Sequence, residues 1–501
     1  MRFAIKNNVL VPELLCTSEL SLSFYPISKF PTIPLPLYNK NFIFSPELQT
    51  YLQGKQLLFD EIPFLLQLIQ LHYENGYVLY QHGITNKGRT IMCKRCGNHE
   101  DALFGRFHCA RCGTECMYCR KCITMGRVSQ CTPLISWVGP EASVTIPDHV
   151  LNWSGSLSEG QQAASDAVTN AIKENQQLLV WAVCGAGKTE VLFQGVEAAI
   201  LAKKKVCIAT PRTDVVIELA PRLKASFPEI DVIALYGGSE DRGKSALLTL
   251  ATTHQLLRFY RAFDVVVIDE VDAFPYSSEP MLQYAVINAK KEQSATIFLS
   301  ATPSAAWQKE VIQGKRNAVT IPARFHRYPL PVPHFEWCGN WKKQLSKKKL
   351  PQILLKWIAV HLQQQKQAFL FAPHITTLNE IIKLLQPLYP AIQGVHSEDP
   401  ERKEKVAAFR KGEIPILLTT TILERGVTVP NIDVAVLGAE DLIFTESALV
   451  QITGCVGRSP SYPSGDIVFF HYGKTNAMIL AKKQIEQMNN EAREKGMLVT
   501  L

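Results

Sequence analysis

The chain has 501 residues, enough for two to four domains, and its 47% apolar and 20% charged content is ordinary for a folded protein. Its net charge of +8 permits a polyanionic partner without requiring one. No run of about 18 apolar residues predicts a membrane span, and the N-terminus lacks the features of a signal peptide. We therefore expect a cytosolic protein, where thirteen cysteines indicate metal binding more than disulfides.

Residues 1–85 form a first region to which the sequence assigns no function. Pro26, Pro31, Pro34 and Pro36 predict a linker or an extended arm. A helical pattern follows over residues 45–75, so we expect this region to be mainly helical.

Residues 86–135 contain eight of the thirteen cysteines, most of them in Cys-x₂-Cys pairs. Structural zinc sites use four thiolates in this kind of pattern. Spacing alone favours the two nearest pairs as ligands, Cys93, Cys96, Cys109 and Cys112. The segment is also basic, and it could grip DNA or a partner with Phe104, Phe107 and Tyr118 as stacking platforms, or simply be a solvated face.

After a linker at residues 140–147, short apolar runs alternate with helix-length segments. This alternation predicts parallel α/β sheets, in one lobe over residues 150–325 and a second over 335–495, with the hinge between them at 322–349. The predicted strands are Leu178–Val183, Val206–Ala209, Val265–Ile268, Thr296–Leu299, Ala368–Phe371, Ile416–Leu418, Val434–Leu437 and Ile467–Phe470.

A glycine loop follows the first of these strands and opens a helix, as in ATP-binding P-loops. Lys188 is predicted to reach the β and γ phosphates, and the Thr189 hydroxyl to ligate Mg²⁺. The usual pattern begins with Gly where this chain has Ala182, a departure that helicase-type loops often accept. The predicted loop residues are Ala182, Val183, Cys184, Gly185, Ala186, Gly187, Lys188 and Thr189.

Two acids follow the strand Val265–Ile268, at the carboxyl end where such sheets bind ligands. Asp269 is predicted to hold Mg²⁺, and Glu270 to orient and deprotonate the attacking water. Gln161 lies upstream of the loop; by itself it is typical of a solvated surface residue, and only a resemblance to helicase lobes implies that this position reads the adenine edge.

Several downstream segments resemble motifs of superfamily 2 helicases, which implies two tandem RecA-like lobes. By this resemblance Arg212, Thr253, Gln255, Thr420 and Arg425 contact nucleic acid. Ser300, Ala301, Thr302 and Gln451 couple hydrolysis to movement, and Arg458 stabilises charge on the γ-phosphate. The superfamily usually carries a second arginine where this chain has Cys455, which predicts weaker turnover.

Residues 75–495 resemble the ComFA family of late-competence ATPases, on the stretches 181–190, 269–276 and 419–428. The resemblance implies a cytoplasmic motor at the inner face of the membrane that moves single-stranded DNA into the cell during transformation. It also implies as partners a membrane uptake channel, competence proteins such as ComFC, and further copies of the chain.

The same resemblance changes the expected zinc ligands, because residues 118–122 match the second cysteine turn of the family. It favours Cys93, Cys96, Cys119 and Cys122. The remaining Cys109, Cys112, Cys116 and Cys131 could then form a second site.

Two alternatives stay open at this level. One is a replication-restart helicase resembling PriA, although there the cysteines interrupt the motor lobes instead of preceding them. The other is a nucleotide-gated scaffold that docks partners through the zinc module, against which the intact Lys188, Asp269, Glu270 and Arg458 count.

Overall fold

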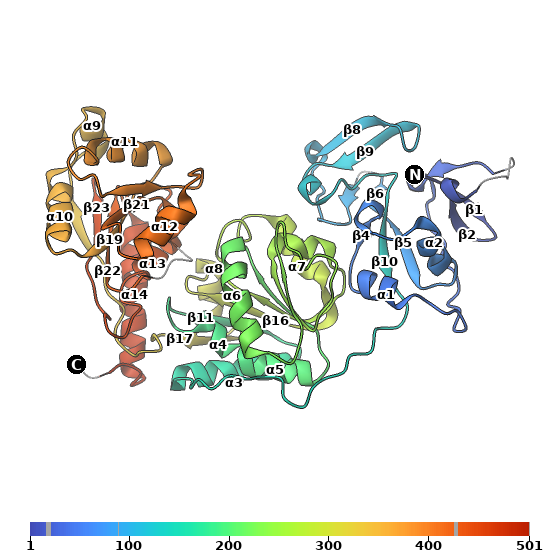
Figure 1. Cartoon of the computed structure of the whole chain (residues 1–501), viewed down its shortest axis with the longest axis horizontal. Coiled ribbons are helices and arrows are strands. Elements are labelled where there is room, and N and C mark those ends of the chain that lie inside the picture. The colour runs from blue at the N-terminus through green and yellow to red at the C-terminus, as the bar shows by residue number, and fades with distance from the viewer. Residues whose placement is uncertain (17–21, 89, 425–428, 500–501) are drawn as a thin grey trace. The chain divides into compact units, whose positions relative to one another are not determined.

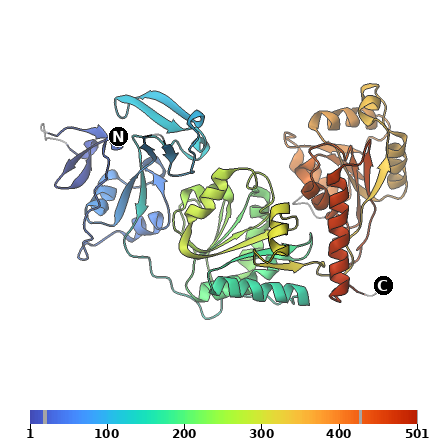
Figure 2. The ribbon, with the colours of Figure 1, turned by 180° about the vertical axis from the view of Figure 1, so that it is seen from behind.

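The computed structural model describes residues 1–16, 22–88, 90–424 and 429–499. Its contacts divide the chain into two compact units. The first unit comprises residues 1–154, 168–178 and 193–298, and the second comprises residues 155–167, 179–192 and 299–501. Figure 1 labels the elements of both units, and Figure 2 shows them from behind.

The N-terminal region is less helical than its sequence predicts. One small sheet has the strand order β2-β1-β3 and another has the order β4-β10-β5, with two short helices beside them. The elements are β1 (Arg2–Lys6), β2 (Val9–Pro12), β3 (Tyr25–Pro26), α1 (Pro46–Leu52), β4 (Leu57–Leu58), α2 (Leu66–Glu74), β5 (Val78–His82) and β10 (Pro133–Trp137).

The helical pattern at 45–75 is interrupted for a local reason. Ser45 caps α1 by accepting a hydrogen bond from the Leu48 amide at 3.1 Å. Gly54 then adopts φ 67°, which ends the helix, and Pro63 precedes α2. A Cβ at Gly54 would lie 2.8 Å from the Cβ of Ala262, so this turn packs tightly on its neighbour.

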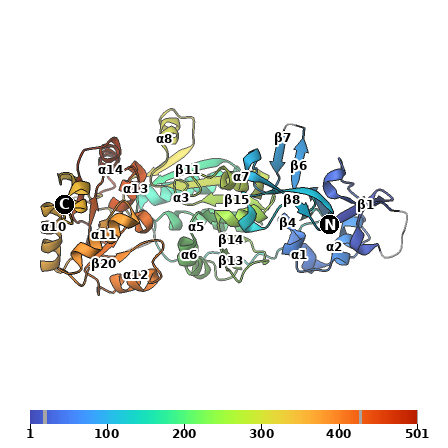
Figure 3. The same cartoon turned by 90° about the horizontal axis from the view of Figure 1, so that it is seen from above.

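Two antiparallel hairpins carry most of the clustered cysteines, and Figure 3 labels both strands of the first hairpin, β6 and β7. The first joins β6 (Ile84–Lys87) to β7 (Thr90–Cys93), and the second joins β8 (Phe104–Cys109) to β9 (Thr114–Cys119). In the second hairpin Cys109 pairs with Thr114 near the turn, whereas Cys119 pairs with Phe104 at the open end. This register separates cysteines that are close in sequence.

A seven-stranded sheet follows, with the order β13-β14-β12-β15-β16-β11-β17. Parallel pairs join β13, β14, β12, β15 and β16 in sequence, and a further parallel pair joins β11 to β17. Its elements are α3 (Glu159–Lys173), β11 (Gln177–Ala182), α4 (Lys188–Val191), α5 (Phe193–Leu201), β12 (Val206–Thr210), α6 (Thr213–Ser226), β13 (Val232–Leu235), β14 (Leu248–Thr252), the 3₁₀ segment η6 (Thr253–Arg258), β15 (Phe263–Ile268), α7 (Pro280–Ala289), β16 (Lys290–Ser300), α8 (Ala305–Ile312) and β17 (Ala318–Ile321).

A six-stranded parallel sheet completes the second unit, with the order β18-β23-β22-β19-β21-β20. Buried apolar clusters cover both of its faces, as its continuous apolar strands predict. Its elements are β18 (His334–Trp337), α9 (Trp341–Ser346), α10 (Gln352–Gln363), β19 (Gln367–Phe371), α11 (Ile375–Leu385), β20 (Gln393–Val395), α12 (Arg402–Arg410), β21 (Ile416–Thr419), η7 (Thr421–Leu423), β22 (Ile432–Leu437), α13 (Glu446–Thr453), β23 (Ile467–His471) and α14 (Asn476–Glu494).

The prediction of two parallel α/β sheets after a cysteine-rich N-terminal region is confirmed. All eight predicted strands are present, most of them one or two residues longer than the apolar runs that indicated them. Figure 2 shows the long helix α14 running beside the strands of the second sheet. Within the described ranges, we find no helix with the length and apolar character needed to cross a bilayer.

Candidate functional site

The glycine loop between β11 and α4 has the backbone shape that a phosphate-binding loop needs. Gly185 and Gly187 have positive φ angles of 82° and 72°, which residues with a Cβ rarely adopt. A Cβ at Gly187 would also lie 2.3 Å from Nε2 of Gln161. Because Ala182, Val183, Cys184 and Ala186 are buried, this loop would meet phosphates through its backbone, and it fits a nucleotide.

Gln161 packs directly against this loop. It is 4% exposed, and its Nε2 donates to the carbonyl oxygen of Ala186 at 2.8 Å. Its Oε1 accepts from the Ser158 amide at 2.8 Å. A side-chain amide has one further donor and a further lone pair, so adenine contact remains compatible with this placement.

Asp269 and Glu270 follow β15 directly, and both side chains are half-buried. The Asp269 amide donates to the Ala209 carbonyl at 2.8 Å, which joins the end of β15 to β12. Glu270 has a left-handed backbone with φ 55°, a conformation that costs a non-glycine residue about 1 kcal/mol and that clusters at functional sites. Paired carboxylates at a strand end fit Mg²⁺. Lys188 and Thr189 belong to the second unit, whereas these acids belong to the first.

The predicted coupling segment contacts both C-terminal helices of the second unit. The carbonyl oxygen of Ala301 accepts from Nε1 of Trp181 at 3.2 Å and from Nε2 of Gln484, in α14, at 2.8 Å. The hydroxyl oxygens of Thr302 and Ser447, in α13, are 2.7 Å apart. Ser300 accepts from the Thr302 amide at 2.9 Å, which shapes the turn.

Gln451 and Gly454 bring the end of α13 against the glycine loop. Oε1 of Gln451 accepts from the Cys184 thiol at 3.1 Å. A Cβ at Gly454 would lie 2.5 Å from the Cβ of Cys184, so only glycine permits this approach. Arg458 donates from Nε to the Gly454 carbonyl at 2.8 Å. Cys455 is buried, and this burial raises the pKa of its thiol.

The residues predicted to contact nucleic acid differ in their burial and in their hydrogen-bond partners. Arg212 is bonded to Asp214, so it would exchange that partner for a phosphate. Thr253 is fully buried, whereas Gln255 is half-buried and its Oε1 accepts from Arg258 at 2.6 Å. Thr420 precedes η7 and is 9% exposed. Arg425 lies outside the described residues.

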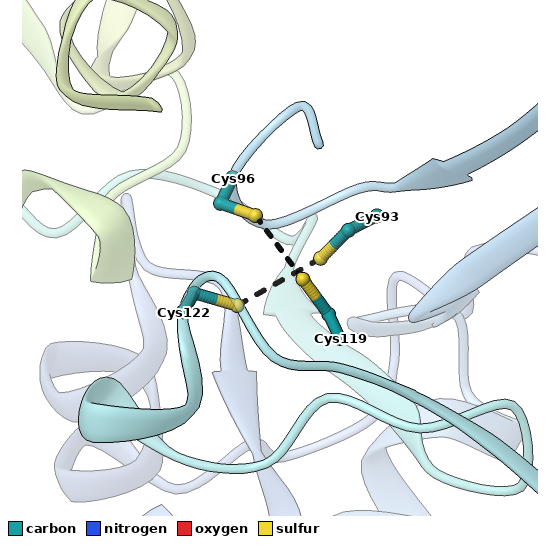
Figure 4. A group of neighbouring side chains, drawn as sticks. All are labelled: Cys93, Cys96, Cys119 and Cys122. Carbon is teal, nitrogen blue, oxygen red and sulfur yellow. Dashed lines mark hydrogen bonds between the residues drawn. The ribbon is translucent and has the colours of Figure 1, made fainter. Parts of the chain in front are cut away.

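Four cysteine sulfurs converge between the two hairpins, those of Cys93, Cys96, Cys119 and Cys122 (Figure 4). All four are buried, and their sulfurs lie within 4.8 Å of one another. The Cys93–Cys122 and Cys96–Cys119 sulfur distances are 3.8 and 3.6 Å. A zinc–sulfur bond of ~2.3 Å in a tetrahedron requires sulfurs ~3.8 Å apart, so this group fits zinc. The neighbouring thiols of Cys122, Cys93 and Cys96 lower the pKa of Cys119, which favours the thiolate that binds metal.

A second buried group of four sulfurs, those of Cys109, Cys112, Cys116 and Cys131, lies near the turn of the β8–β9 hairpin. The Cys109 and Cys131 sulfurs are 3.6 Å apart, again close to the tetrahedral edge for zinc. The structure therefore groups the cysteines as the family resemblance implies, and not by the nearest pairs in sequence.

A cavity of about 570 Å³ borders this second group. Its wall includes four arginines, Arg111, Arg127, Arg242 and Arg258. The Arg127 guanidinium lies 4.8 Å from the centre of the Phe107 ring, which itself packs edge-on against Tyr118. Phe104 is 8% exposed and therefore does not offer a free stacking face.

Comparison with known proteins agrees with this arrangement. The competence protein ComFA N-terminal domain matches residues 39–136, the DEAD/DEAH box helicase domain matches 159–311, and the helicase conserved C-terminal domain matches 347–460. Competence protein ComFA of Bacillus subtilis (strain 168) is 48% identical over 453 residues, covering 90% of this chain and 97% of that protein. The chain belongs to the ComFA family.

A second ComFA, that of Streptococcus pneumoniae (strain ATCC BAA-255 / R6), is 40% identical and covers 77% of this chain and 91% of that protein. A solved structure of RecG bound to a three-way DNA junction is 17% identical, with a TM-score of 0.47 over 69% of this chain and 49% of that one. The ComFA membership, with its two helicase domains, makes this chain a DEAD-box helicase-family ATPase.

This ComFA-family chain also has a functional candidate that the sequence did not suggest, Arg324. Its side chain is 1% exposed and contacts four backbone carbonyls. Nε donates to Cys184 at 3.1 Å, and the two terminal nitrogens donate to Gly454, Val456 and Gly457. Burial lowers the pKa of Arg324 to about 10, so the group stays charged at neutral pH.

No sequence signal separates Arg324 from an ordinary surface arginine, because it lies in the irregular hinge segment where no periodicity predicts burial. Its contacts arise only when the glycine loop and the end of α13 come together within the second unit. Arg324 lies in the segment that the sequence predicted to be a hinge between two lobes. That prediction gave no role to any side chain in the hinge.

Proposed function

We propose that this ComFA-family ATPase is a motor that uses ATP to move single-stranded DNA into the cell during natural transformation. In this proposal Lys188 and Thr189 bind the phosphates and Mg²⁺, Asp269 holds Mg²⁺, and Glu270 activates the attacking water. Gln161 reads adenine, and Arg458 stabilises the charge that develops on the γ-phosphate.

The observation that carries this proposal is the contact set around the glycine loop and the coupling segment. Cys184 of the loop bonds to Gln451, and Thr302 bonds to Ser447, both on α13. If nucleotide binding moves the glycine loop, these contacts transmit the movement to α13, the helix that precedes Arg458. Such a shared element is what lets a bound ligand bias one conformation over another.

DNA is proposed to bind through Arg212, Thr253, Gln255, Thr420 and Arg425, with its phosphates making the binding fall as salt rises. The side chains of Arg212 and Gln255 already bond to charged neighbours, Asp214 and Arg258. A phosphate could replace the first of these partners, and a base edge or sugar could share the second.

We propose that both cysteine groups bind Zn²⁺, the first through Cys93, Cys96, Cys119 and Cys122, and the second through Cys109, Cys112, Cys116 and Cys131. Bound zinc would supply folding energy to the two hairpins. The proposed partners are an uptake channel at the inner face of the membrane, ComFC and further copies of this chain.

Movement along DNA can be tested by release of streptavidin from an end-biotinylated single strand. The protein should displace streptavidin from one end of the strand only, and only with hydrolysable ATP. Glu270→Gln keeps the side-chain shape and loses the base, so it should bind ATP and DNA without displacement. Release that is equally fast without ATP, or that survives in the Glu270 variant, would reject the motor and leave the nucleotide-gated scaffold as the explanation.

A further inference from the structure

The first Cys-x₂-Cys turn carries a buried arginine between its two cysteines. The Arg95 side chain is 0% exposed, and its NH2 donates to both carboxylate oxygens of Glu61, at 2.9 and 2.8 Å. Its Nε donates to the carbonyl oxygen of Leu257 at 3.3 Å. The cysteine turn therefore contacts both the N-terminal region and the η6 segment of the helicase domain, all within the first unit.

Glu61 joins Arg95 to the end of η6. The same carboxylate accepts from Nε of Arg258 at 2.9 Å, and Arg258 in turn donates from NH1 to Oε1 of Gln255 at 2.6 Å. The Glu61 side chain is only 8% exposed, and it also accepts from the Leu58 amide at 3.0 Å. A continuous chain of hydrogen bonds thus runs from the cysteine turn to a proposed DNA contact.

The Glu61 carboxylate is a buried negative charge surrounded by arginine side chains. Burial by itself would raise the pKa of Glu61, but Arg95 and Arg258 hold that pKa below its usual range, so the carboxyl is ionised at neutral pH. Arg242 approaches the same carboxylate at 3.8 Å. One buried anion therefore orients several guanidinium groups, and Arg95 reaches both of its oxygens through NH2.

Further contacts join both cysteine turns to the helicase domain near α7, separately from Glu61. Lys121, between Cys119 and Cys122, pairs with Glu279 at 2.8 Å, immediately before α7. The Tyr284 hydroxyl, on α7, donates to the Lys94 carbonyl at 3.2 Å. With both turns attached, the first cysteine group contacts the helicase domain at η6 and α7, within the first unit.

We infer that Glu61 is a positioning residue for DNA binding, which sets Arg258 and Gln255 in place, and that the first cysteine group holds Glu61 through Arg95. This inference rests on the proposed function for Gln255 as a DNA contact. It assigns a purpose to the N-terminal region that the sequence left without one. The competing explanation is a structural staple that stabilises the fold without affecting how η6 meets DNA.

The test compares Glu61→Gln with a control, Asp60→Asn. Asp60 is the neighbour of Glu61 in sequence and forms an exposed ion pair with Arg111 at 2.9 Å. Glu61→Gln should raise the oligonucleotide concentration that half-saturates the ATPase about tenfold, the effect of one lost charge-assisted hydrogen bond. The KM for ATP, the rate without DNA and the rate at saturating DNA should stay near parental values. Asp60→Asn should leave all four unchanged.

A double variant separates positioning from stapling. Gln255→Ala alone should raise the half-saturating DNA concentration, and adding Glu61→Gln should raise it no further, because both act through one contact. Arg95→Lys keeps the charge but loses the guanidinium that contacts Glu61 and Leu257 together, so it should shift DNA binding in the same direction by a smaller factor. Additive effects of Glu61→Gln and Gln255→Ala, or a lower stability of Glu61→Gln with unchanged DNA half-saturation, would overturn the inference in favour of the staple.

Amide hydrogen exchange gives a readout that does not depend on DNA-stimulated activity. Zinc removal by a chelator and Glu61→Gln should both speed exchange across residues 253–262, and Asp60→Asn should not. If the parent protein shows no DNA stimulation while this exchange pattern holds, the proposed function fails but the positioning of η6 stands. Parental exchange in this segment after zinc removal and in Glu61→Gln would reject the positioning itself.

Discussion

Arg324 donates a hydrogen bond from Nε to the backbone oxygen of Cys184, 3.1 Å away, and so joins the hinge segment to the glycine loop. The same guanidinium reaches Gly454, Val456 and Gly457 at the end of α13. One buried cation thus bonds to backbone carbonyls of two elements, the glycine loop and the end of α13, which the proposed mechanism requires to act together.

Arg324→Lys should therefore impair both stability and nucleotide binding. A lysine can reach at most one or two of these carbonyls, and the loss should lower the unfolding free energy of this unit by about 3 kcal/mol. The KM for ATP should rise more than kcat falls, because the loop is loosened and no reacting group is removed. Arg327→Lys is the matched control, since that exposed side chain donates to the backbone oxygens of Gly496 and Met497. Equal effects in the two variants would show that the contacts of Arg324 are not important.

Lys188 and Glu270 should separate nucleotide binding from hydrolysis. Lys188→Ala should weaken ATP binding or abolish turnover, because it removes the charge that pairs with the phosphates. Glu270→Gln should bind ATP like the parent and turn over at least about a hundredfold more slowly, as expected for loss of a general base. ATP binding measured with a fluorescent analogue, alongside steady-state turnover, separates the two. Parental turnover in the Glu270 variant would exclude that residue as the base.

Purified protein should contain about two equivalents of zinc, one for each group of four cysteines. Cys93→Ser should release one of them, and Cys109→Ser should release the other while leaving the first in place. Loss at the first site should loosen η6 as well as the hairpin, whereas loss at the second should expose residues near the β8–β9 turn to protease. Elemental analysis of each variant decides this. Protein freshly purified without any metal would contradict both sites.

Asp433 should make the second sheet sensitive to acid. It lies 2.7 Å from Nζ of Lys366 and 2.9 Å from Nε2 of His361, and it is almost fully buried. Burial alone would raise the pKa of Asp433, but these partners hold it below its usual range. The stabilisation is therefore complete above about pH 4 and is lost as the pH falls through the lowered pKa.

Asp433→Asn should consequently destabilise this lobe at neutral pH by about 3 kcal/mol and flatten its stability profile below pH 4. Glu401→Gln, at an exposed acid that pairs with Lys405, is the control and should change stability by less than about 1 kcal/mol. Urea unfolding across this pH range measures both. A profile of the Asp433 variant that parallels the parent would contradict the assignment.

The sequence predicted the elements that are locally encoded. Strands such as β15 and β22 are continuous apolar runs, and the glycine loop is specified by residues that adjoin it. It missed the edge strands β18 and β20, whose residues are partly polar and partly exposed because one side of each strand lacks a neighbour. The helical pattern at 45–75 concealed Gly54, whose left-handed backbone ends α1.

Contacts between distant segments could not be predicted from local patterns. Spacing could not pair the cysteines, because the β8–β9 register carries Cys119 away from Cys116 and toward Cys93. Glu61 lies almost two hundred residues from Arg258 in sequence, and nothing near either residue indicates their pairing at 2.9 Å. These long-range pairs are the ones that the proposed positioning and coupling depend on.

The ATPase rate as a function of single-stranded DNA concentration, for the parent and for Arg458→Ala, tests the account most directly. A strand bound to both lobes should favour the conformation in which Arg458 stabilises the γ-phosphate, so DNA should raise the parent's rate at low salt. Arg458→Ala should bind ATP almost normally and lose this stimulation, and duplex DNA and RNA should stimulate the parent less. A parent rate that DNA leaves unchanged at low salt, without any partner protein, would contradict an autonomous DNA motor.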